Sequence, residues 1–300
     1  MQVYRKQIKQ RNALRVVSLL LAAAFVTGCM QTRMQARLKD SDRSFAAGSI
    51  LSLPDGRPID FDTLVAELAE TPVVFVGESH TSRSHHAIQL KILTALADLR
   101  PEISVGMEMF DVDYQPLLDR WSAGELSLEQ LVEATHWYAN WRYDITLYEE
   151  LLTFVKDRKL RLVALNIPPH IPPKISTGGL DSLLPSEKSY LPRRLDTSDS
   201  RHREWVERIF RQHNLRGRKK FDYFYAAQCV WEDKMAESIV ASLGSGQMVV
   251  LAGNGHIIRK FGIPDRVSGR NGLETRTVYL VTAGSTFTLA DGDYVWVTPR

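Results

Sequence analysis

The sequence predicts an α/β protein with a mainly parallel β-sheet flanked by helices and a smaller helical domain inserted into it. Two observations predict this class. Short apolar runs rich in β-branched residues recur along the chain, as in strands buried on both faces. They alternate with stretches in which apolar residues recur at helical spacing. The apolar runs are residues 73–76, 103–107, 160–165 and 248–252.

The first two runs are joined by a predicted helix at residues 81–99. Within it, Ile88, Ile92, Leu96 and Leu99 recur at three- and four-residue intervals, which places them on one helix face. A strand, a helix and a second strand joined by short links are typical of a parallel βαβ unit. We therefore expect the sheet domain to comprise residues 51–111 and 159–300.

Two further stretches, residues 112–158 and 199–243, show mostly helical periodicity and predict the inserted helical sub-domain. Residues 168–198 hold six prolines and are expected to form a long irregular connection. The chain is expected to close with strands at 277–282 and 294–298, separated by a turn around Asp291 and Gly292.

The first 28 residues have the pattern of a secretory signal peptide. Five basic residues and no acidic one occur in residues 1–15, and an eleven-residue apolar run follows at 16–26. That run is shorter than the roughly 20 residues that a membrane-spanning helix needs. Two kinds of signal fit this pattern: that of a lipoprotein, in which Cys29 is lipidated, and an ordinary secretory signal in which the cysteine is incidental.

Residues 26–29 read VTGC and resemble the lipobox of bacterial lipoproteins, in which the cysteine is lipidated. This resemblance implies cleavage before Cys29 and anchoring by lipid, with residues 29–50 as a flexible tether. Met30 after the cysteine suggests the outer membrane, so we expect a cell-envelope protein that faces the periplasm.

Removal of the signal changes the charge of the chain. The formal net charge of +3 includes its five basic residues, so without them about −2 remains. This small negative charge argues against nucleic acid as a partner. Of the two cysteines, only Cys229 would stay free after lipidation of Cys29, so no disulfide within the chain is expected.

Polar side chains follow four of the predicted strands. The carboxyl ends of parallel strands share one edge of a sheet, where ligands bind. His85 and His86 follow in the first turn of the next helix, where the helix dipole favours neutral imidazole. The candidate pocket residues are Glu78, His80, His85, His86, Glu108, Asn166, Asn254 and His256.

A single histidine after a strand is more often structural than catalytic. Two histidines together with two glutamates at converging strand ends favour a functional site. Histidines 136, 170, 202 and 213 are expected on the surface. The aromatic residues of 137–148, which include Tyr138, Tyr143 and Tyr148, are expected mainly in the core of the helical sub-domain.

Five motifs in order resemble the ChaN-type haem-binding lipoproteins. They read VGESH at 76–80, with two histidines five residues on, GMEMF at 106–110, ALN at 164–166, AQCVWEDKMA at 227–236 and GNGH at 253–256. The resemblance extends over residues 50–260. It implies haem bound between two subunits, a homodimer formed on ligand binding, and a role in iron uptake or storage.

In that family a tyrosine is the iron ligand, which makes Tyr138, Tyr143 and Tyr148 the candidates here. Tyrosinate suits ferric haem because its anionic oxygen neutralises excess charge on the iron. No metal other than the haem iron is assigned.

Glu78 and His80 with the distant His256 also resemble a wider superfamily that includes erythromycin esterase-like hydrolases and the Tiki and TraB proteins. That resemblance implies a hydrolase in which His80 or Glu78 is the general base, alone or on a divalent metal, and Glu108 and His256 complete the site. A third reading is a scaffold or partner-binding lipoprotein without catalysis.

Overall fold

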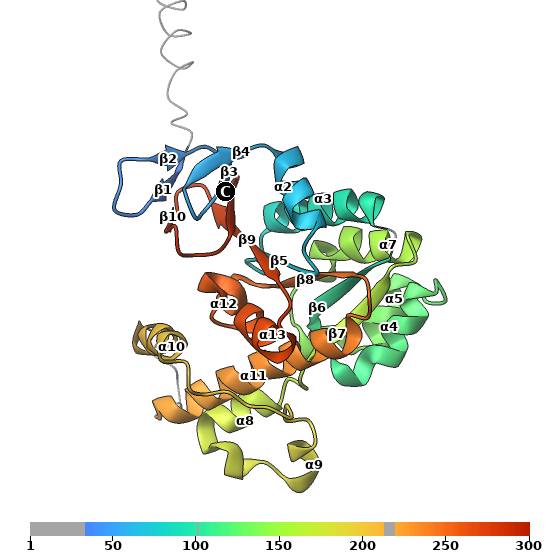
Figure 1. The fold of residues 1–300 in the computed structure, drawn as a ribbon. Helices are drawn as coiled ribbons and strands as arrows, with labels where there is room; N and C mark the ends of the chain where they lie inside the picture. The colour runs from blue at the N-terminus through green and yellow to red at the C-terminus, as the bar shows by residue number, and fades with distance from the viewer. Residues whose placement is uncertain (1–33, 101, 213–219) are drawn as a thin grey trace, which may run out of the picture. The chain divides into compact units, whose positions relative to one another are not determined.

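The computed structural model describes residues 34–100, 102–212 and 220–300, and residues Gln35–Arg300 form one compact unit. Its centre is an eight-stranded sheet (Figure 1). The strand order is β4 (Arg57–Ile59), β3 (Ile50–Ser52), β11 (Tyr294–Thr298), β9 (Thr275–Thr282), β5 (Val73–Glu78), β8 (Gln247–Gly253), β6 (Ile103–Asp111) and β7 (Arg161–Asn166). The six strands from β11 to β7 are parallel, and β3 pairs with β11 in the antiparallel sense.

The predicted α/β class is confirmed, and each predicted strand is present. All residues of β5, β6 and β8 are buried, as expected of strands covered on both faces. Strand β6 is longer than its apolar run. It continues to Asp111, and its register with β7 shifts between Met107 and Asp111. This irregular end of β6 contains Glu108.

One face of the sheet is covered by the helices from the first half of the chain. Their apolar residues share a core with alternate residues of β5, β6 and β8, such as Val74, Val105 and Val249. These helices are α2 (Phe61–Ala69), α3 (Arg83–Leu99), α4 (Gln115–Ser122), α5 (Leu128–Ala134), α6 (Trp137–Asn140) and α7 (Glu149–Asp157), with the 3-10 turns η1 (Val112–Tyr114) and η2 (Ile145–Leu147).

The opposite face is covered by helices from the second half. Val73, Phe75 and Val250 form a second core there with α11 and α13, and α8 and α10 pack on α11. The helices are α8 (Ile171–Gly178), α9 (Pro185–Lys188), α10 (Ser200–Gln212), α11 (Phe221–Ser242), α12 (Asn254–Ile257) and α13 (Ile263–Asn271), with η3 (Leu180–Ser182) and η4 (Ile258–Lys260).

The two helical stretches therefore do not pack together as one inserted sub-domain. Residues 112–158 contribute to the core on one face of the sheet, and residues 221–242 contribute to the core on the other. The physical reason is that each stretch has an apolar stripe of its own, and each stripe is buried against the sheet. Helical periodicity in the sequence predicts that a helix has an apolar stripe, but it does not predict on which face of the sheet the helix packs.

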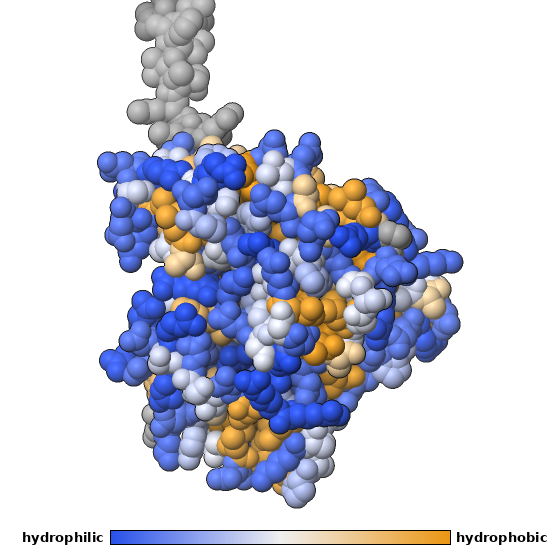
Figure 2. Space-filling model, viewed as in Figure 1, coloured by the Kyte–Doolittle hydropathy of each residue, from blue (hydrophilic) through white to orange (hydrophobic). Residues whose placement is uncertain are grey.

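Residues 168–198 are less irregular than expected, because two of their proline groups begin helices. Pro172 and Pro173 lie in the first turn of α8, and Pro185 begins α9. Proline is tolerated there because the first N–H groups of a helix have no partner within it. Seen from the same side as Figure 1, the surface is mostly hydrophilic, with apolar side chains in several patches, one of them over α8 (Figure 2). Leu184, just before α9, is exposed.

The folded unit begins earlier than the predicted boundary at residue 51. Residues 35–50 were expected to belong to a flexible tether, but they contain β1 (Ala36–Leu38) and β2 (Ser44–Phe45), which form a small sheet with β10 (Thr286–Phe287). Ala36 and Leu38 are buried with Phe287. Strands of two or three residues are too short for a visible alternation of apolar residues, so the sequence showed no periodicity.

The predicted signal peptide and Cys29 lie outside the described residues. Within the described part, no helix is both long and apolar enough to cross a membrane.

Candidate functional site

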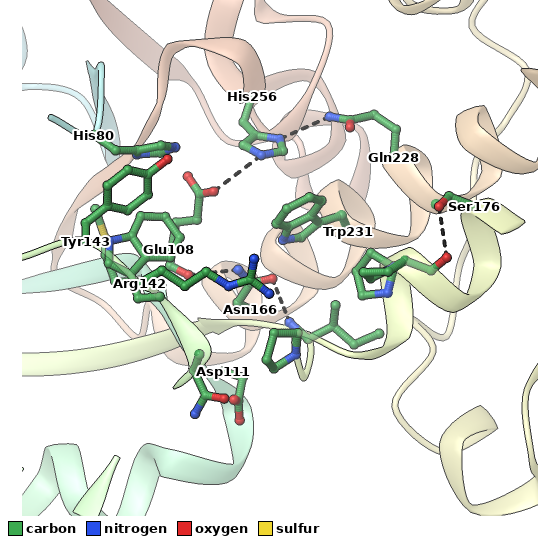
Figure 3. A pocket seen from close by; sticks show the side chains of 18 of the residues that line it. His80, Glu108, Asp111, Arg142, Tyr143, Asn166, Ser176, Gln228, Trp231 and His256 are labelled. Carbon is green, nitrogen blue, oxygen red and sulfur yellow. Dashed lines mark hydrogen bonds and ion pairs between the residues drawn. The ribbon is translucent and has the colours of Figure 1, made fainter. Parts of the chain in front are cut away.

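The candidate site is a cavity of about 350 Å³ at the carboxyl ends of the parallel strands (Figure 3). His80 follows β5, Glu108 lies in the last part of β6, Asn166 ends β7 and His256 lies in α12, directly after β8. All four line the cavity. The sheet thus brings together these predicted residues, which are up to 176 positions apart in sequence.

Glu78 is buried, and both of its carboxylate oxygens contact polar side chains. Its Oε1 atom accepts hydrogen bonds from His80 Nδ1 and the Tyr148 hydroxyl, both at 2.7 Å. Its Oε2 atom accepts one from Gln89 Nε2 at 3.0 Å and lies 3.3 Å from His86 Nε2. Burial alone would raise the pKa of this carboxyl, but the interactions with His80 and His86 lower it to about 2. Glu78 is therefore a fixed anion at neutral pH.

His80 connects this anion to the cavity. Its ring contacts Trp141 and Tyr143, with ring centroids 4.8 and 5.1 Å away. Burial alone would lower the pKa of the imidazole, but the hydrogen bond to Glu78 and the charges of Glu108 and Glu78 raise it above its usual value. The backbone of Gly253 passes close to the ring, since a Cβ on Gly253 would lie 2.8 Å from His80 Cε1.

Glu108 and His256 form the second acid–base pair of the site. Glu108 Oε2 accepts a hydrogen bond from the backbone N–H of Gly253 at 2.7 Å, and Oε1 lies 3.4 Å from His256 Nε2. The charge of His256, its hydrogen bond and the charge of His80 lower the pKa of the Glu108 carboxyl, against the opposing effect of burial.

His256 is held between two carboxylates. On its other side, Nδ1 lies 3.3 Å from Oε1 of Glu232 on α11. Burial alone would lower the pKa of His256, but Glu108 and Glu232 raise it to about 10. His256 is therefore a cation at neutral pH, unlike a general base that must accept a proton.

Glu232 extends this network away from the cavity. Its Oε2 atom lies 3.2 Å from Nε2 of His202 on α10 and 3.6 Å from Arg266. The expectation that His202 lies on the surface was wrong, because this side chain is buried. Its amphipathic helix turns His202 toward α11, where a buried carboxylate needs a cationic or donor partner.

His85, His86 and Asn254 do not line the cavity. His85 Nδ1 accepts a hydrogen bond from the backbone N–H of Ser79 at 2.9 Å, and burial lowers the pKa of this imidazole to about 4. Neutral histidine was expected here, although burial rather than the helix dipole is the main cause. Asn254 Nδ2 donates to Leu280 O at 2.8 Å. These three side chains hold the strand ends in place.

The three candidate tyrosines have different environments. Tyr148 is buried and donates its hydroxyl proton to Glu78, and burial and the Glu78 charge raise its pKa far above the usual range. Tyr138 is 55% exposed and does not line the cavity. Tyr143 lines the cavity, and its hydroxyl makes no hydrogen bond within the described residues. Only Tyr143 thus has the position and the free oxygen that an iron ligand needs.

Other cavity residues were not predicted as site residues. They come from the end of β6, from α6 and the α6–η2 connection, from the β7–α8 connection, and from α8 and α11, and most of them are apolar or aromatic: Met109, Asp111, Asn140, Trp141, Arg142, Ile167, Pro169, Pro172, Pro173, Ser176, Phe224, Ala227, Gln228 and Trp231. Trp141 was expected in a helical core. The spacing of Gln228, Trp231 and Glu232 at three- and four-residue intervals could have placed them on one face of α11.

The site can hold an amphipathic ligand. It combines flat aromatic and proline surfaces, suited to a planar ring system, with a free phenol oxygen and cationic groups. Among the described residues, no group of three or more His, Cys, Asp or Glu side chains is arranged to hold a metal ion.

Comparison with known protein families shows to which family this chain belongs. Residues 64–267, more than half of the chain, match the model of the family described as haem-binding uptake, Tiki superfamily, ChaN. The chain belongs to this family. The match includes every candidate pocket residue and all three candidate tyrosines.

The fold is also shared with a solved ChaN structure, described as cofacial heme binding to ChaN of Campylobacter jejuni. It is 22% identical, has a TM-score of 0.68, and aligns with 82% of this chain and 95% of that one. An erythromycin esterase in an open conformation is more distant, at 13% identity and a TM-score of 0.45, with 78% and 76% coverage.

Among curated proteins, the chloroplastic protein RETICULATA-RELATED 5 of Arabidopsis thaliana is 25% identical over 276 residues. The aligned region covers 83% of this chain but 37% of that relative.

Proposed function

We propose that this protein binds haem in the cavity at the strand ends, with Tyr143 as the iron ligand. Membership of a haem-binding family supports the ligand class. The observation that carries the assignment to this cavity is Tyr143, whose free hydroxyl lies beside His80 and Trp141 in an aromatic and proline-lined space.

The residues of the cavity suit the parts of an iron-porphyrin. Trp141, Trp231 and the prolines of α8 offer apolar surface to the ring, and the phenol oxygen of Tyr143 can bind ferric iron after loss of its proton. His80 is next to Tyr143 and hydrogen-bonded to the Glu78 carboxylate. It is placed to accept that proton when it is itself neutral.

We further propose that the protein is a lipid-anchored component of the bacterial cell envelope that takes up or stores haem iron. The signal-like residues 1–28 and the lipobox at Cys29 support this location, at the outer membrane and facing the periplasm. A homodimer formed on haem binding follows from the family resemblance, and the open side of the cavity would allow a second subunit to cover the ligand.

Hemin titration followed by the Soret band tests the assignment. The wild-type protein is expected to shift the band with saturable binding. Tyr143→Phe, which removes only the ligand oxygen, is expected to weaken binding at least tenfold and to change the spectrum. Tyr138→Phe is the matched control and is expected to behave as wild type. Absence of any shift, or equal behaviour of both variants, would overturn the proposal.

A hydrolase is the second candidate, favoured by the pairing of His80 with Glu78 and of His256 with Glu108. In this reading, neutral His80 accepts a proton from water while cationic His256 stabilises developing negative charge. An ester and peptide substrate panel with Glu108→Gln tests it. Activity that survives this substitution unchanged would exclude a role for the pair.

A further inference from the structure

The small sheet of β10, β1 and β2 lies where the folded unit begins. Gln35, the first residue of that unit, is tied to the fold by two hydrogen bonds. Its backbone oxygen accepts one from the N–H of Gly284 at 3.2 Å, and its side-chain oxygen accepts one from the Ser44 hydroxyl at 2.7 Å. Figure 1 shows the three strands together at the end of the large sheet that is formed by β3 and β4.

The chain between Cys29 and this sheet is short. Six residue steps separate Cys29 from Gln35, and an extended chain covers at most about 3.6 Å per step, or roughly 22 Å in all. The predicted tether of residues 29–50 was much longer. Lipid on Cys29 would therefore hold the small sheet, rather than any other part of the fold, close to the membrane surface.

The exposed face of the small sheet carries cations that no described residue pairs with. Alternate residues of β1 are buried, so Arg37 lies on the exposed face. Lys39 continues this alternation, because its N–H still donates to Phe287 O on β10 at 2.8 Å and its side chain is exposed. Arg37 is paired across the sheet with the exposed hydroxyl residues Ser44 and Thr286. Neither Arg37 nor Lys39 forms an ion pair in the part of the chain that the structure describes.

The acidic residues of this region lie outside the three strands. Asp40 and Asp42 are in the turn that joins β1 to β2, and Asp55 is paired with Arg57. The strands themselves contain no acidic residue. Because the two turn carboxylates oppose the cations at one end of the hairpin, the part of the face that suits an anion is centred on Arg37.

We propose that the exposed face of the small sheet docks on the membrane that holds the lipid of Cys29, with Arg37 and Lys39 against the phosphates of anionic phospholipid headgroups. The proposal rests on the proposed lipid anchor, and it adds which surface of the protein faces the bilayer. Arginine and lysine donate charge-assisted hydrogen bonds to phosphate oxygens. The anchor supplies the membrane affinity, and the basic face fixes the orientation of the protein on the surface.

The test uses the whole lipidated protein in vesicles of phosphatidylcholine with or without phosphatidylglycerol. A fluorophore is attached through Thr286→Cys on the small sheet, or through Glu129→Cys on α5, across the molecule in Figure 1. Cys229 stays unlabelled because it is buried and burial raises the pKa of its thiol to about 12, and lipid occupies the thiol of Cys29. A nitroxide on the lipid headgroups is expected to quench the label at position 286 in phosphatidylglycerol vesicles, but not the label at position 129.

Arg37→Gln combined with Lys39→Gln is expected to lower the ratio of docked to undocked protein roughly thirtyfold, from about fivefold per charge. High salt should also reduce docking. The matched control is Arg120→Gln combined with Arg158→Gln, which removes the same charge from two exposed, ion-paired residues elsewhere, and it should dock as wild type does. Equal quenching of the two labels, or quenching that Arg37→Gln with Lys39→Gln leaves unchanged, would overturn the proposal while lipid anchoring stands. A mature protein without lipid on Cys29, measured by mass spectrometry, would overturn both.

Discussion

The protonation state of His256 depends on the two carboxylates beside its ring. Its pKa of about 10 exceeds the usual value near 6.5 because Glu108 and Glu232 flank the ring. The folded state therefore keeps a proton that the unfolded chain releases. This contribution to stability is complete below about pH 6.5 and is lost as the pH rises toward 10.

We therefore expect the free energy of unfolding, measured with urea, to fall between pH 7 and 10, by at most about 1.4 kcal/mol per pH unit for one proton. His256→Gln should show a flatter dependence over this range. His170→Gln, at an exposed histidine, is the control and should follow the wild type. If the free energy of unfolding depended on pH equally in wild type and His256→Gln, a raised pKa of His256 between Glu108 and Glu232 would be contradicted.

The backbone of Arg142, with φ at 74° in the left-handed region that favours glycine, gives a second prediction at the residue scale. Arg142→Gly removes the steric cost of a side chain at positive φ and should raise the free energy of unfolding by about 0.5–1 kcal/mol in thermal unfolding. Lys159→Gly, at a second exposed residue with positive φ (53°), should gain a similar amount. An Arg142→Gly protein that is less stable than wild type would contradict backbone strain at this position.

At the scale of elements, α11 matters most, because it packs on the sheet and also places Glu232 in a buried cluster with His256, His202 and Arg266. Glu232 faces His256, His202 and Arg266 with no exposure of its side chain. Removing one partner from a buried charged group leaves the others uncompensated, so Glu232→Gln should cost about 3–5 kcal/mol in urea unfolding. Glu207→Gln, at a surface pair on α10, should cost less than about 0.5 kcal/mol. Similar losses for the two variants would contradict a structural role of the cluster.

The elements that could be predicted were those with strong periodicity. Strands buried on both faces and the long helix α3 were visible as apolar runs and intervals. Strands β1 and β2 were missed because they are too short to show alternation. Helix α8 was missed because proline in a first turn looks, in sequence, like proline in a loop.

At the scale of the whole molecule, the parallel sheet explains why part of the site was predictable. One rule, that the carboxyl ends of parallel strands share one edge of the sheet, predicts the positions of Glu78, His80, Glu108, Asn166 and His256. Trp141, Arg142 and Trp231 do not, because they reach the cavity from helices and connections on opposite faces of the sheet. Their place depends on long-range packing that local periodicity does not encode.

Assembly and anchoring belong to the same scale. If haem is shared between two subunits, size-exclusion chromatography should show a monomer without hemin and a dimer with it, and Tyr143→Phe should reduce the dimer fraction. A dimer that is equally populated without hemin would contradict ligand-driven assembly.

In bacterial cells, Cys29→Ser should move the protein from the membrane fraction to the soluble fraction. Unchanged fractionation would contradict lipid anchoring.

The position of bound iron can be measured directly. Crystals of the protein with hemin, measured at the iron absorption edge, give an anomalous peak at the metal. We expect this peak beside the Tyr143 hydroxyl oxygen, inside the cavity lined by His80, Asn166 and Trp231. A peak at Tyr138, or elsewhere outside the cavity, would contradict the assignment of this site to haem.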